Sequence, residues 1–402
     1  MSRLGKGGFA ALGVVSLVAF NLRPSLASVG PVLNEAMAAL HLSAGAASML
    51  TTAPVLCLGI FGPLAPLLAR RFGIEGAILL ALATVAFGIG VRAGGTSVLL
   101  VGGSLVAGAG VAVGNVLSPS LLKRDFPRHL PLATGLYTMA VCIGAAVAAG
   151  FTAPARLLAH QLGLAPDWAF ALAVWALPAA LAVGVGGLAW RRHLHAGAGI
   201  AARMPPVRGL WRNALAWQVT LYMGLQSAMG YIVFAWLPPI LRSRGDDAVT
   251  AGAATSLCIL AQVLAALPVP LLASRWRHQS VAALAVMLLA GGSFFALVHL
   301  PLSWQWLLST TLGTGMGGAF ALAIMLIVLR APDGHTAAAL SSMAQSVGYS
   351  LAAAGPLLVG MLHDATGDWS GAVGIYLGIG SLGALCGALA GRDRLVRPRM
   401  HS

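Results

Sequence analysis

The most regular feature of the chain is a series of long apolar runs separated by short polar breaks. A membrane-spanning helix needs about 20 mostly apolar residues, and twelve runs approach or exceed that length. They cover roughly residues 9–32, 44–69, 76–93, 97–122, 132–156, 168–190, 214–240, 250–273, 280–299, 304–329, 336–362 and 370–391. The pattern predicts an all-α membrane protein with twelve transmembrane helices.

The longest polar break, residues 191–213, divides these runs into two sets of six. It is rich in Arg, Gly and Pro, as is typical of a flexible linker. TGLYTMAVCIG at 134–144 matches AALSSMAQSVG at 338–348, which indicates an internal duplication. We therefore expect an N-terminal six-helix bundle at 1–190, a cytoplasmic linker at 191–213 and a C-terminal six-helix bundle at 214–402.

Composition agrees with a membrane protein. The chain is 58% hydrophobic and only 8% charged, with a mean hydropathy of +0.88, whereas a soluble domain carries about 25% charged residues. Lipid is therefore the expected main solvent of the folded chain. The four cysteines all fall inside apolar runs without a metal-binding spacing, which favours a role in packing.

The net charge of +14 has a distribution that predicts topology. Lys and Arg collect in the cytoplasmic loops of membrane proteins. Twelve spans place both termini on one side, together with nearly all the basic residues. Apart from Arg23 inside the first run, the opposite side holds only Arg92, Arg156, Arg242 and Arg244. We expect a multi-pass protein of the inner (plasma) membrane with both termini cytoplasmic, and no nucleic-acid partner.

The stretch FNLRPSL at 20–26 places a charge near the middle of the first run. A charge at the bilayer centre costs at least about 2.5–3.5 kcal/mol, so such a residue usually faces a polar cavity and has a function. We expect Arg23 to be the only charged residue buried at this depth. Its guanidinium suits small anions, although it could instead bind backbone groups of a neighbouring helix. Pro24 removes an amide and is expected to bend the helix.

Two neighbours of Arg23 complicate a simple pocket. Asn21 and Ser25 lie four residues apart and share one helix face with Ser28. At about 100° per residue, Arg23 points to the other side of an ideal helix. Arg23 and Asn21 can therefore meet one ligand only if the helix unwinds at Pro24.

Several stretches carry a resemblance to a known family, among them FNLRPSLASVGP, LTTAPVLCLGIFGPLAPLLARRFG and MAQSVGYSLAAAGPLLVGMLHDATGDW. The chain resembles the cyanate/2-nitroimidazole transporter family of the major facilitator superfamily. The resemblance implies two six-helix bundles with a substrate site between them and transport by alternating access. The implied cargo is a small anion or small polar solute such as cyanate. The alternative is efflux of nitro-heterocyclic or drug-like compounds such as 2-nitroimidazole.

Polar and aromatic residues inside the runs are the candidates for lining a substrate path. The candidates in the first half are Asn21, Arg23, Ser25, Thr52, Asn115 and Tyr137, and those in the second half are Gln226, Tyr231, Trp236, Gln262, Gln345 and Tyr349. Gln345 and Tyr349 are four residues apart and share a helix face. Each of these residues has the alternative role of joining neighbouring helices by hydrogen bonds.

Charged residues in two cytoplasmic loops are candidates for gating. Arg70, Arg71 and Glu75 follow the second run, where the wider superfamily usually has an acidic residue at the position of Arg70. A swapped ion pair is one way in which they could latch this side. Lys123, Arg124 and Asp125 follow the fourth run, and their simplest interpretation is a basic loop with an internal ion pair.

Other classes of function find no support in the sequence. The chain has no nucleotide-binding Walker loop, no metal-ligand cluster and no nucleophile constellation, so we expect no enzymatic activity, cofactor or metal. The run GTGMGG at 313–318 lies inside an apolar span and is expected to allow close helix packing. The expected partners are a small-molecule substrate and the lipid bilayer, with a monomer as the working unit. A membrane sensor is a further alternative, although no signalling domain is recognisable.

Overall fold

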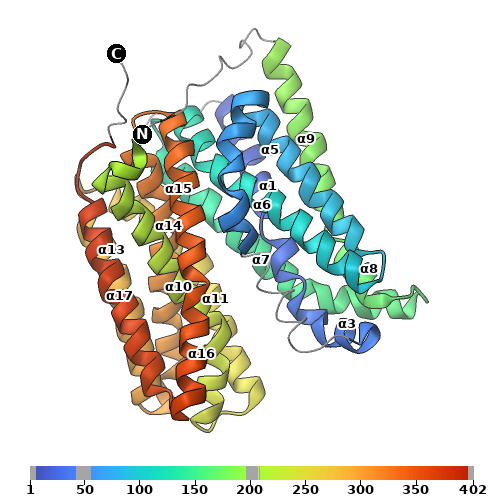
Figure 1. Ribbon diagram of the computed structural model, residues 1–402, viewed down its shortest axis with the longest axis vertical. Coiled ribbons are helices and arrows are strands. Elements are labelled where there is room, and N and C mark those ends of the chain that lie inside the picture. The colour runs from blue at the N-terminus through green and yellow to red at the C-terminus, as the bar shows by residue number, and fades with distance from the viewer. Residues whose placement is uncertain (1–5, 42–55, 196–206, 208, 397–402) are drawn as a thin grey trace. The chain divides into compact units, whose positions relative to one another are not determined.

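The computed structural model describes residues 6–41, 56–195, 207 and 209–396. Every regular element among these residues is a helix, which confirms the predicted all-α class. Clustering of contacts divides the chain into two compact units (Figure 1). The first unit comprises residues 1–121 and 140–206, and the second comprises 122–139 and 207–402.

The first unit begins with an interrupted helix. The helices of this part are α1 (Lys6–Asn21), α2 (Pro24–Ala27), η1 (Gly30–Val32), α3 (Leu33–Leu40), α5 (Leu64–Arg92), α6 (Ser97–Asp125), α7 (Leu130–Gln161), α8 (Asp167–Ala173) and α9 (Ala176–His195). Glycine brings α5 and α6 together, because a Cβ at Gly88 would lie 2.7 Å from the Gly103 carbonyl oxygen. Small residues therefore let these two backbones approach closely.

The second unit contains η2 (Leu210–Arg212), α10 (Ala214–Ser243), α11 (Ala248–Ala265), α12 (Pro268–Ala273), α13 (Ser280–His299), η3 (Leu302–Trp304), α14 (Gln305–Arg330), α15 (Gly334–Ala352), α16 (Ala354–Thr366) and α17 (Ser370–Ala390). Helix α14 lies deepest, with 83% of its most apolar window buried, and it packs against α11 and α13. A Cβ at Gly315 would lie 2.8 Å from the Val286 carbonyl oxygen, and one at Gly317 would lie 2.6 Å from the Gln262 Cα. The prediction that GTGMGG is a packing surface is confirmed.

Ten helical segments of the described residues are long and apolar enough to cross a membrane, and α11 is a shorter apolar helix. The predicted span at 44–69 lies partly outside the described residues. Helix α5 contains the end of that span and the whole of the next, joined at Gly73, which has φ 77°. Three predicted spans each consist of two helices, with interruptions before or near Pro178, Pro268 and Pro356. The expected apolar runs are thus helical wherever the structure describes them.

Candidate functional site

The first span is broken at the place where Arg23 stands. Helix α1 ends at Asn21, Leu22 and Arg23 are not helical, and α2 begins at Pro24. Pro24 has no N–H for the Phe20 carbonyl four residues earlier, so the ladder of hydrogen bonds stops here. The Leu22 amide instead donates to the Ala19 carbonyl, three residues earlier, at 3.1 Å. The predicted bend at Pro24 is therefore a two-residue interruption.

Several buried polar groups surround this interruption. Asn21 is 1% exposed and donates from Nδ2 to the Leu17 carbonyl at 2.9 Å, while its Oδ1 has no partner among the described residues. The hydroxyls of Ser25 and Ser28 are buried and also lack a described partner. Arg23 is half-buried, and its guanidinium lies within electrostatic range of the Cys142 thiol of α7. Because the helix is interrupted after Asn21, Asn21 and Arg23 are not fixed on opposite sides as they would be in an ideal helix.

Arg92 is a second buried charge of the first unit. The sequence assigned it to the outer side, at the end of the apolar run 76–93; it is the last residue of α5 and is 0% exposed. That Arg23 is the only charge at mid-membrane depth stays a prediction. The Arg92 Nη1 donates to the Ser25 carbonyl of α2 at 2.9 Å. Its Nε and Nη2 have no hydrogen-bond partner in the described part of the chain. Arg330, the last residue of α14, is likewise 3% exposed.

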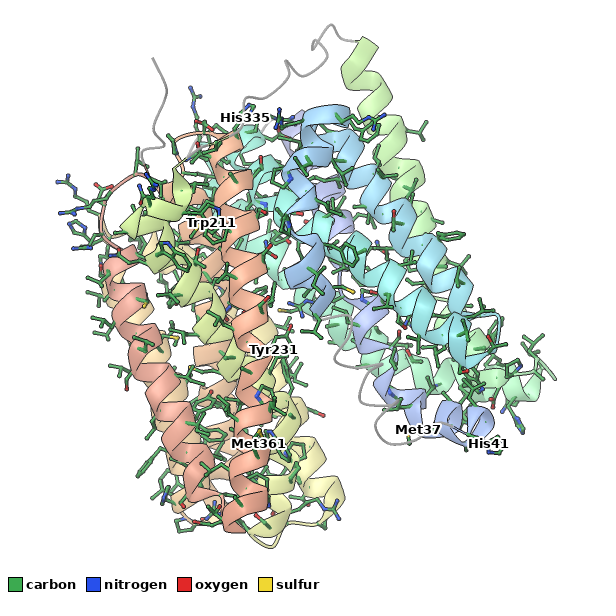
Figure 2. All side chains as sticks on the ribbon, viewed as in Figure 1. Met37, His41, Trp211, Tyr231, His335 and Met361 are labelled. Atoms are coloured by element: carbon green, nitrogen blue, oxygen red, sulfur yellow. The ribbon has the colours of Figure 1, made fainter. Side chains whose placement is uncertain are left out.

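Polar and aromatic candidates of the second unit meet where α10 packs against α15. The rings of Tyr231 and Tyr349 lie 6.5 Å apart in an edge-to-face arrangement, and Tyr231 lies about midway along this unit (Figure 2). Gln345 donates to the Ser341 hydroxyl at 2.8 Å on α15. Gln226 donates to the Ser227 hydroxyl at 2.7 Å and to the Met223 carbonyl at 2.9 Å. The structure therefore joins Tyr231 and Tyr349, whereas the two Gln side chains bond within their own helices.

Trp236 lies nearer one end of α10 and belongs to an aromatic group. Its Nε1 donates to the Pro356 carbonyl at 2.9 Å, and its ring is 5.6 Å from Trp369. Trp369 stacks on His363 at 3.7 Å and lines a pocket of about 440 Å³ with Asp368 and Arg244. The Ser370 hydroxyl and the Trp369 amide both donate to Asp368 and lower the pKa of its carboxyl group.

The remaining path candidates are spread along other helices. Asn115 on α6 and Tyr137 on α7 are 5% and 1% exposed. Gln262 on α11 is half-buried, forms a side-chain hydrogen bond with Cys258 and packs its backbone on Gly317. Thr52 lies outside the described residues.

Loop charges show one of the expected contacts. Arg124 Nε lies 2.6 Å from Asp125 Oδ1, which confirms the internal ion pair of this loop. Lys123 lies within electrostatic range of Asp333 and Arg330 in the same unit. Arg70 and Arg71 are exposed, Glu75 is half-buried, and the Arg71 guanidinium lies 5.4 Å from the Phe72 ring centre. Gating by these residues stays a prediction.

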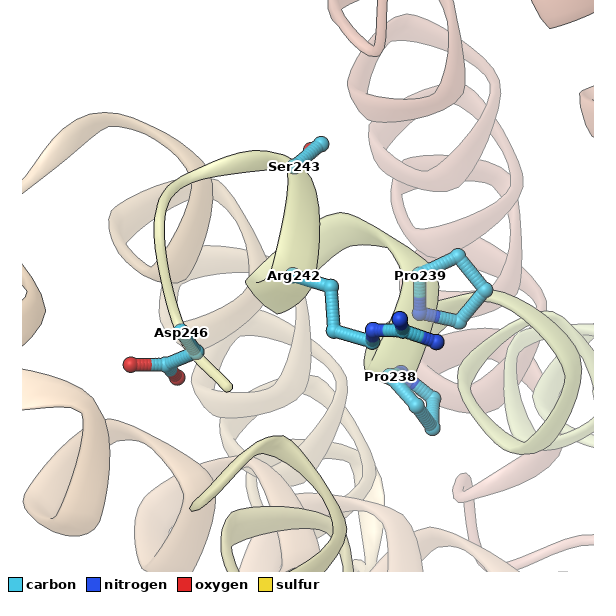
Figure 3. A pocket seen from close by; sticks show the side chains of 5 residues that line it. All are labelled: Pro238, Pro239, Arg242, Ser243 and Asp246. Atoms are coloured by element: carbon cyan, nitrogen blue, oxygen red, sulfur yellow. The ribbon is translucent and has the colours of Figure 1, made fainter. Parts of the chain in front are cut away.

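A second pocket, of about 480 Å³, lies at the end of α10. Figure 3 shows Arg242 extended beside Pro238 and Pro239, whereas Asp246 points away from it. This pocket contains none of the residues predicted to line the path. Arg242 is exposed, as its position beyond the seventh apolar run predicted.

Sequence reasoning missed the two buried arginines because each stands at the end of an apolar run. An arginine in the last turn of a helix can extend into solvent or fold back over its own helix end, and the sequence pattern is the same in both cases. The glycine at position 103 was the one signal in the sequence. In the structure it leaves room for Arg92, because a Cβ there would lie 2.9 Å from the Arg92 Cγ. A glycine in one helix does not by itself reveal which arginine it faces.

Comparison with known proteins places this architecture in one large group of transporters. Residues 11–356 match the family model of the Major Facilitator Superfamily. The chain is 38% identical to an uncharacterized transporter of Bacillus subtilis (strain 168), covering 95% of this chain and 93% of that protein. It is 37% identical to the 2-nitroimidazole transporter of Escherichia coli (strain K12), covering 98% of both chains. It is 29% identical to the cyanate transport protein of the same organism, covering 89% of this chain and 90% of that protein.

Solved structures agree on the fold. The proton:xylose symporter with bound 6-bromo-6-deoxy-D-glucose aligns with a TM-score of 0.72 over 95% of both chains, at 16% identity. At this identity the likeness shows the fold alone. It confirms the predicted arrangement of apolar helices.

Proposed function

This chain belongs to the major facilitator superfamily of transporters, and from that premise we propose that it carries a small anion or small polar solute such as cyanate by alternating access. The observation that carries the proposal is the interruption of the first span at Leu22–Arg23. An interrupted helix at membrane depth is tolerated where it lines a cavity or is buried in protein. Arg23 then supplies a permanent positive charge for the cargo.

The cargo class follows from this charge and from the relatives. A relative named for cyanate transport covers most of the chain, and cyanate is a small linear anion that a guanidinium can bind. Asn21 Oδ1 and the Ser25 hydroxyl are buried near Arg23 without described partners. They provide further polar groups for an ion that has lost its water.

The direct test is uptake of radiolabelled cyanate into proteoliposomes. Arg23→Ala should lower uptake at subsaturating cyanate at least about tenfold, since a hydrogen bond to a charged group is worth roughly 1.5–3 kcal/mol. Arg23→Lys keeps the charge and should retain part of the activity. Arg242→Met is the matched control, because Arg242 is exposed and lies outside the predicted path. Unchanged uptake in both Arg23 variants excludes this role.

Efflux of small nitro-heterocycles such as 2-nitroimidazole is the second candidate. The relative named for 2-nitroimidazole transport covers 98% of both chains. The edge-to-face pair of Tyr231 and Tyr349 offers aromatic surface for a flat ring. Tyr349→Ala should sensitise cells to 2-nitroimidazole if this candidate is right, and it should leave cyanate uptake less affected than Arg23→Ala.

The proposed working arrangement is a monomer in the cytoplasmic membrane with both termini on the cytoplasmic side. The proposed bundles are residues 1–190 and 214–402, joined by a cytoplasmic linker at 191–213. The excess of Lys and Arg on the side of the termini supports this orientation. Reporter fusions at the loops after Arg92 and after Gly209 test it, because the first should report the outer side and the second the cytoplasm.

Lys123, Arg124, Asp125, Arg70, Arg71 and Glu75 are proposed to act at the cytoplasmic gate. The proximity of Lys123 to Asp333 supports a charge contact that forms and breaks during transport. In this proposal the protein is a carrier without cofactor or metal, and it catalyses no chemical change in its cargo.

A further inference from the structure

The interruption at Leu22–Arg23 needs a cause beyond Pro24. Prolines also lie inside three other long helices, at Pro119 in α6, Pro154 in α7 and Pro238–Pro239 in α10. Each of those helices continues past its proline. A proline removes one hydrogen bond and bends a helix, but neighbouring groups can keep the ladder intact. Something outside the first span must therefore hold its two parts in place.

Contacts on either side of the interruption fix its ends. Before it, Gly144 of α7 approaches the end of α1 so closely that a Cβ there would overlap the Phe20 carbonyl oxygen. After it, Arg92 of α5 donates to the Ser25 carbonyl, which belongs to the four-residue helix α2. The carbonyls in the last turn of a helix have no partner within that helix. Arg92 therefore supplies the missing donor for α2.

Arg92 is itself held rigidly. Its aliphatic stem lies on Gly103 of α6, where a Cβ would come within 2.9 Å of both its Cγ and its backbone nitrogen. The residue is 0% exposed, so water does not reach its guanidinium in this conformation. The α5–α6 pair thus forms a fixed platform from which Arg92 reaches the first span.

The charge of Arg92 exceeds what a structural bond to one carbonyl requires. Nε and Nη2 have no hydrogen-bond partner among the described residues, and no ion pair there involves Arg92. The Glu35 and Asp167 carboxylates of the same unit pair instead with Arg156, at 3.2 and 3.3 Å. A buried cation without a counter-ion costs free energy. Such a cost is expected at functional positions rather than at purely structural ones.

From these contacts we infer that Arg92 is a positioning residue of the transport path, which holds α2 through the Ser25 carbonyl so that the interruption stays open and Arg23 keeps its place. This inference rests on the proposed function for its effect on transport. Arg92 itself does not contact the cargo. It acts through the backbone of the span that carries Arg23.

Hydrogen–deuterium exchange tests the structural half of the inference and needs no substrate. In nanodiscs, Arg92→Met should speed exchange of the amides between Leu22 and Val29, because their helix loses its outside donor. Arg92→Lys keeps a charged donor of nearly the same reach and should restore most of the protection. Arg242→Met, also in the last turn of a long helix, should leave this segment unchanged. Equal exchange in Arg92→Met and Arg242→Met overturns the inference.

A double-mutant cycle tests the transport half. Arg92→Met should raise the KM for cyanate about tenfold, the effect of losing one hydrogen bond to a charged group, with a smaller change in maximal rate. In an Arg23→Lys background the same substitution should have little further effect on KM, because the two residues act through one element. Fully additive effects on KM show an independent role for Arg92 and overturn the inference.

The two arms separate failure of this inference from failure of the proposed function. If cyanate is not transported at all, the exchange experiment still decides whether Arg92 holds the interruption. If Arg92→Met does not fold, Arg92→Gln takes its place, because its amide is too short to reach the Ser25 carbonyl. Normal exchange and normal KM in that folded variant overturn the inference equally.

Discussion

Arg92 and Arg330 occupy the same kind of place in the chain but have opposite surroundings. Each is the last residue of a long apolar helix, and each is almost fully buried. Arg330 donates from Nε to the Ala390 carbonyl at 2.9 Å and from Nη2 to Gln279 Oε1 and the Gly391 carbonyl. Asp393 lies 3.9 Å from its Nη1. Among the residues that the structure describes, the Arg92 side chain has one hydrogen bond, to the Ser25 carbonyl.

The difference identifies Arg330 as a structural cross-link and leaves Arg92 as a buried charge with a different role. Arg330 ties the end of α14 to the start of α13 and to the chain after α17, and nearly every donor has a partner. Hydrogen bonds to its donors offset the cost of burying a charge such as Arg330. The Nε and Nη2 donors of Arg92, beside the interruption that carries Arg23, have no partner in the described part of the chain. Burial alone therefore does not tell which arginine serves stability and which serves transport.

Loss of Arg330 should have the largest effect on stability. Arg330→Met removes the guanidinium donors to the Ala390 carbonyl, the Gly391 carbonyl and Gln279 Oε1, whereas the backbone bond from the Gln279 amide to the Gly391 carbonyl remains. Leaving a buried acceptor without its partner costs about 1–3 kcal/mol, and this substitution does so at both the Ala390 carbonyl and Gln279 Oε1. A strong fall in the thermal unfolding temperature of the purified protein in detergent is expected, with Arg242→Met as the control. If Arg330→Met unfolds at the temperature of the control, Arg330 is not a structural cross-link.

Removing one partner of Arg330 should have an intermediate effect. Gln279→Leu leaves part of the Arg330 guanidinium unpaired and makes it resemble Arg92. An unsatisfied buried donor costs about 1–3 kcal/mol. The unfolding temperature should fall less than in Arg330→Met, and the two substitutions combined should cost little more than Arg330→Met alone. Additive losses would show that Gln279 stabilises the unit through other contacts.

Loss of Arg92 should cost less stability than loss of Arg330, although both are buried. Arg92→Met gives up one hydrogen bond but also removes a buried charge without a counter-ion, so the net change should lie within about 1 kcal/mol. Transport should nevertheless fall. A loss of stability as large as that of Arg330→Met would place Arg92 among the structural residues and erase the contrast.

The exposed end of the Arg330 network should have the smallest effect. The Asp393 side chain is 56% exposed, and its Oδ1 lies 3.9 Å from Nη1. Solvent-exposed ion pairs contribute about 0–1 kcal/mol, and salt screens them. Asp393→Asn should leave the unfolding temperature nearly unchanged at high salt. A large loss would mean that Arg330 depends on this carboxylate for neutralisation.

Much of the fold was predictable because lipid imposes a strict rule on sequence. Spans must be apolar and helical, so the runs at 280–299 and 370–391 match α13 and α17 within one residue at either end. Prolines inside runs were less informative. Pro24 coincides with an interruption, whereas Pro154 and Pro238 lie inside continuous helices. Whether the backbone breaks depends on donors from neighbouring helices, which no local pattern reveals.

Candidate site residues show the same division. The pairing of Tyr231 with Tyr349 joins two helices more than a hundred residues apart in sequence, and only the packing of α10 on α15 brings them together. Gln226 and Gln345 were equally plausible candidates. In the structure Gln226 donates to Ser227 and Gln345 donates to Ser341, each within its own helix.

The amino-acid sequence alone is enough to predict that this chain spans a membrane, how its apolar runs follow one another, and that Arg23 carries a costly charge in the first of them. These properties follow from transfer free energies, which act on each segment separately. The inward turn of Arg92 to the Ser25 carbonyl, and the exposure of Arg242, become visible only in the folded chain. That choice depends on whether a neighbouring helix leaves room for the stem and offers a free acceptor, and Gly103 and α2 provide both for Arg92.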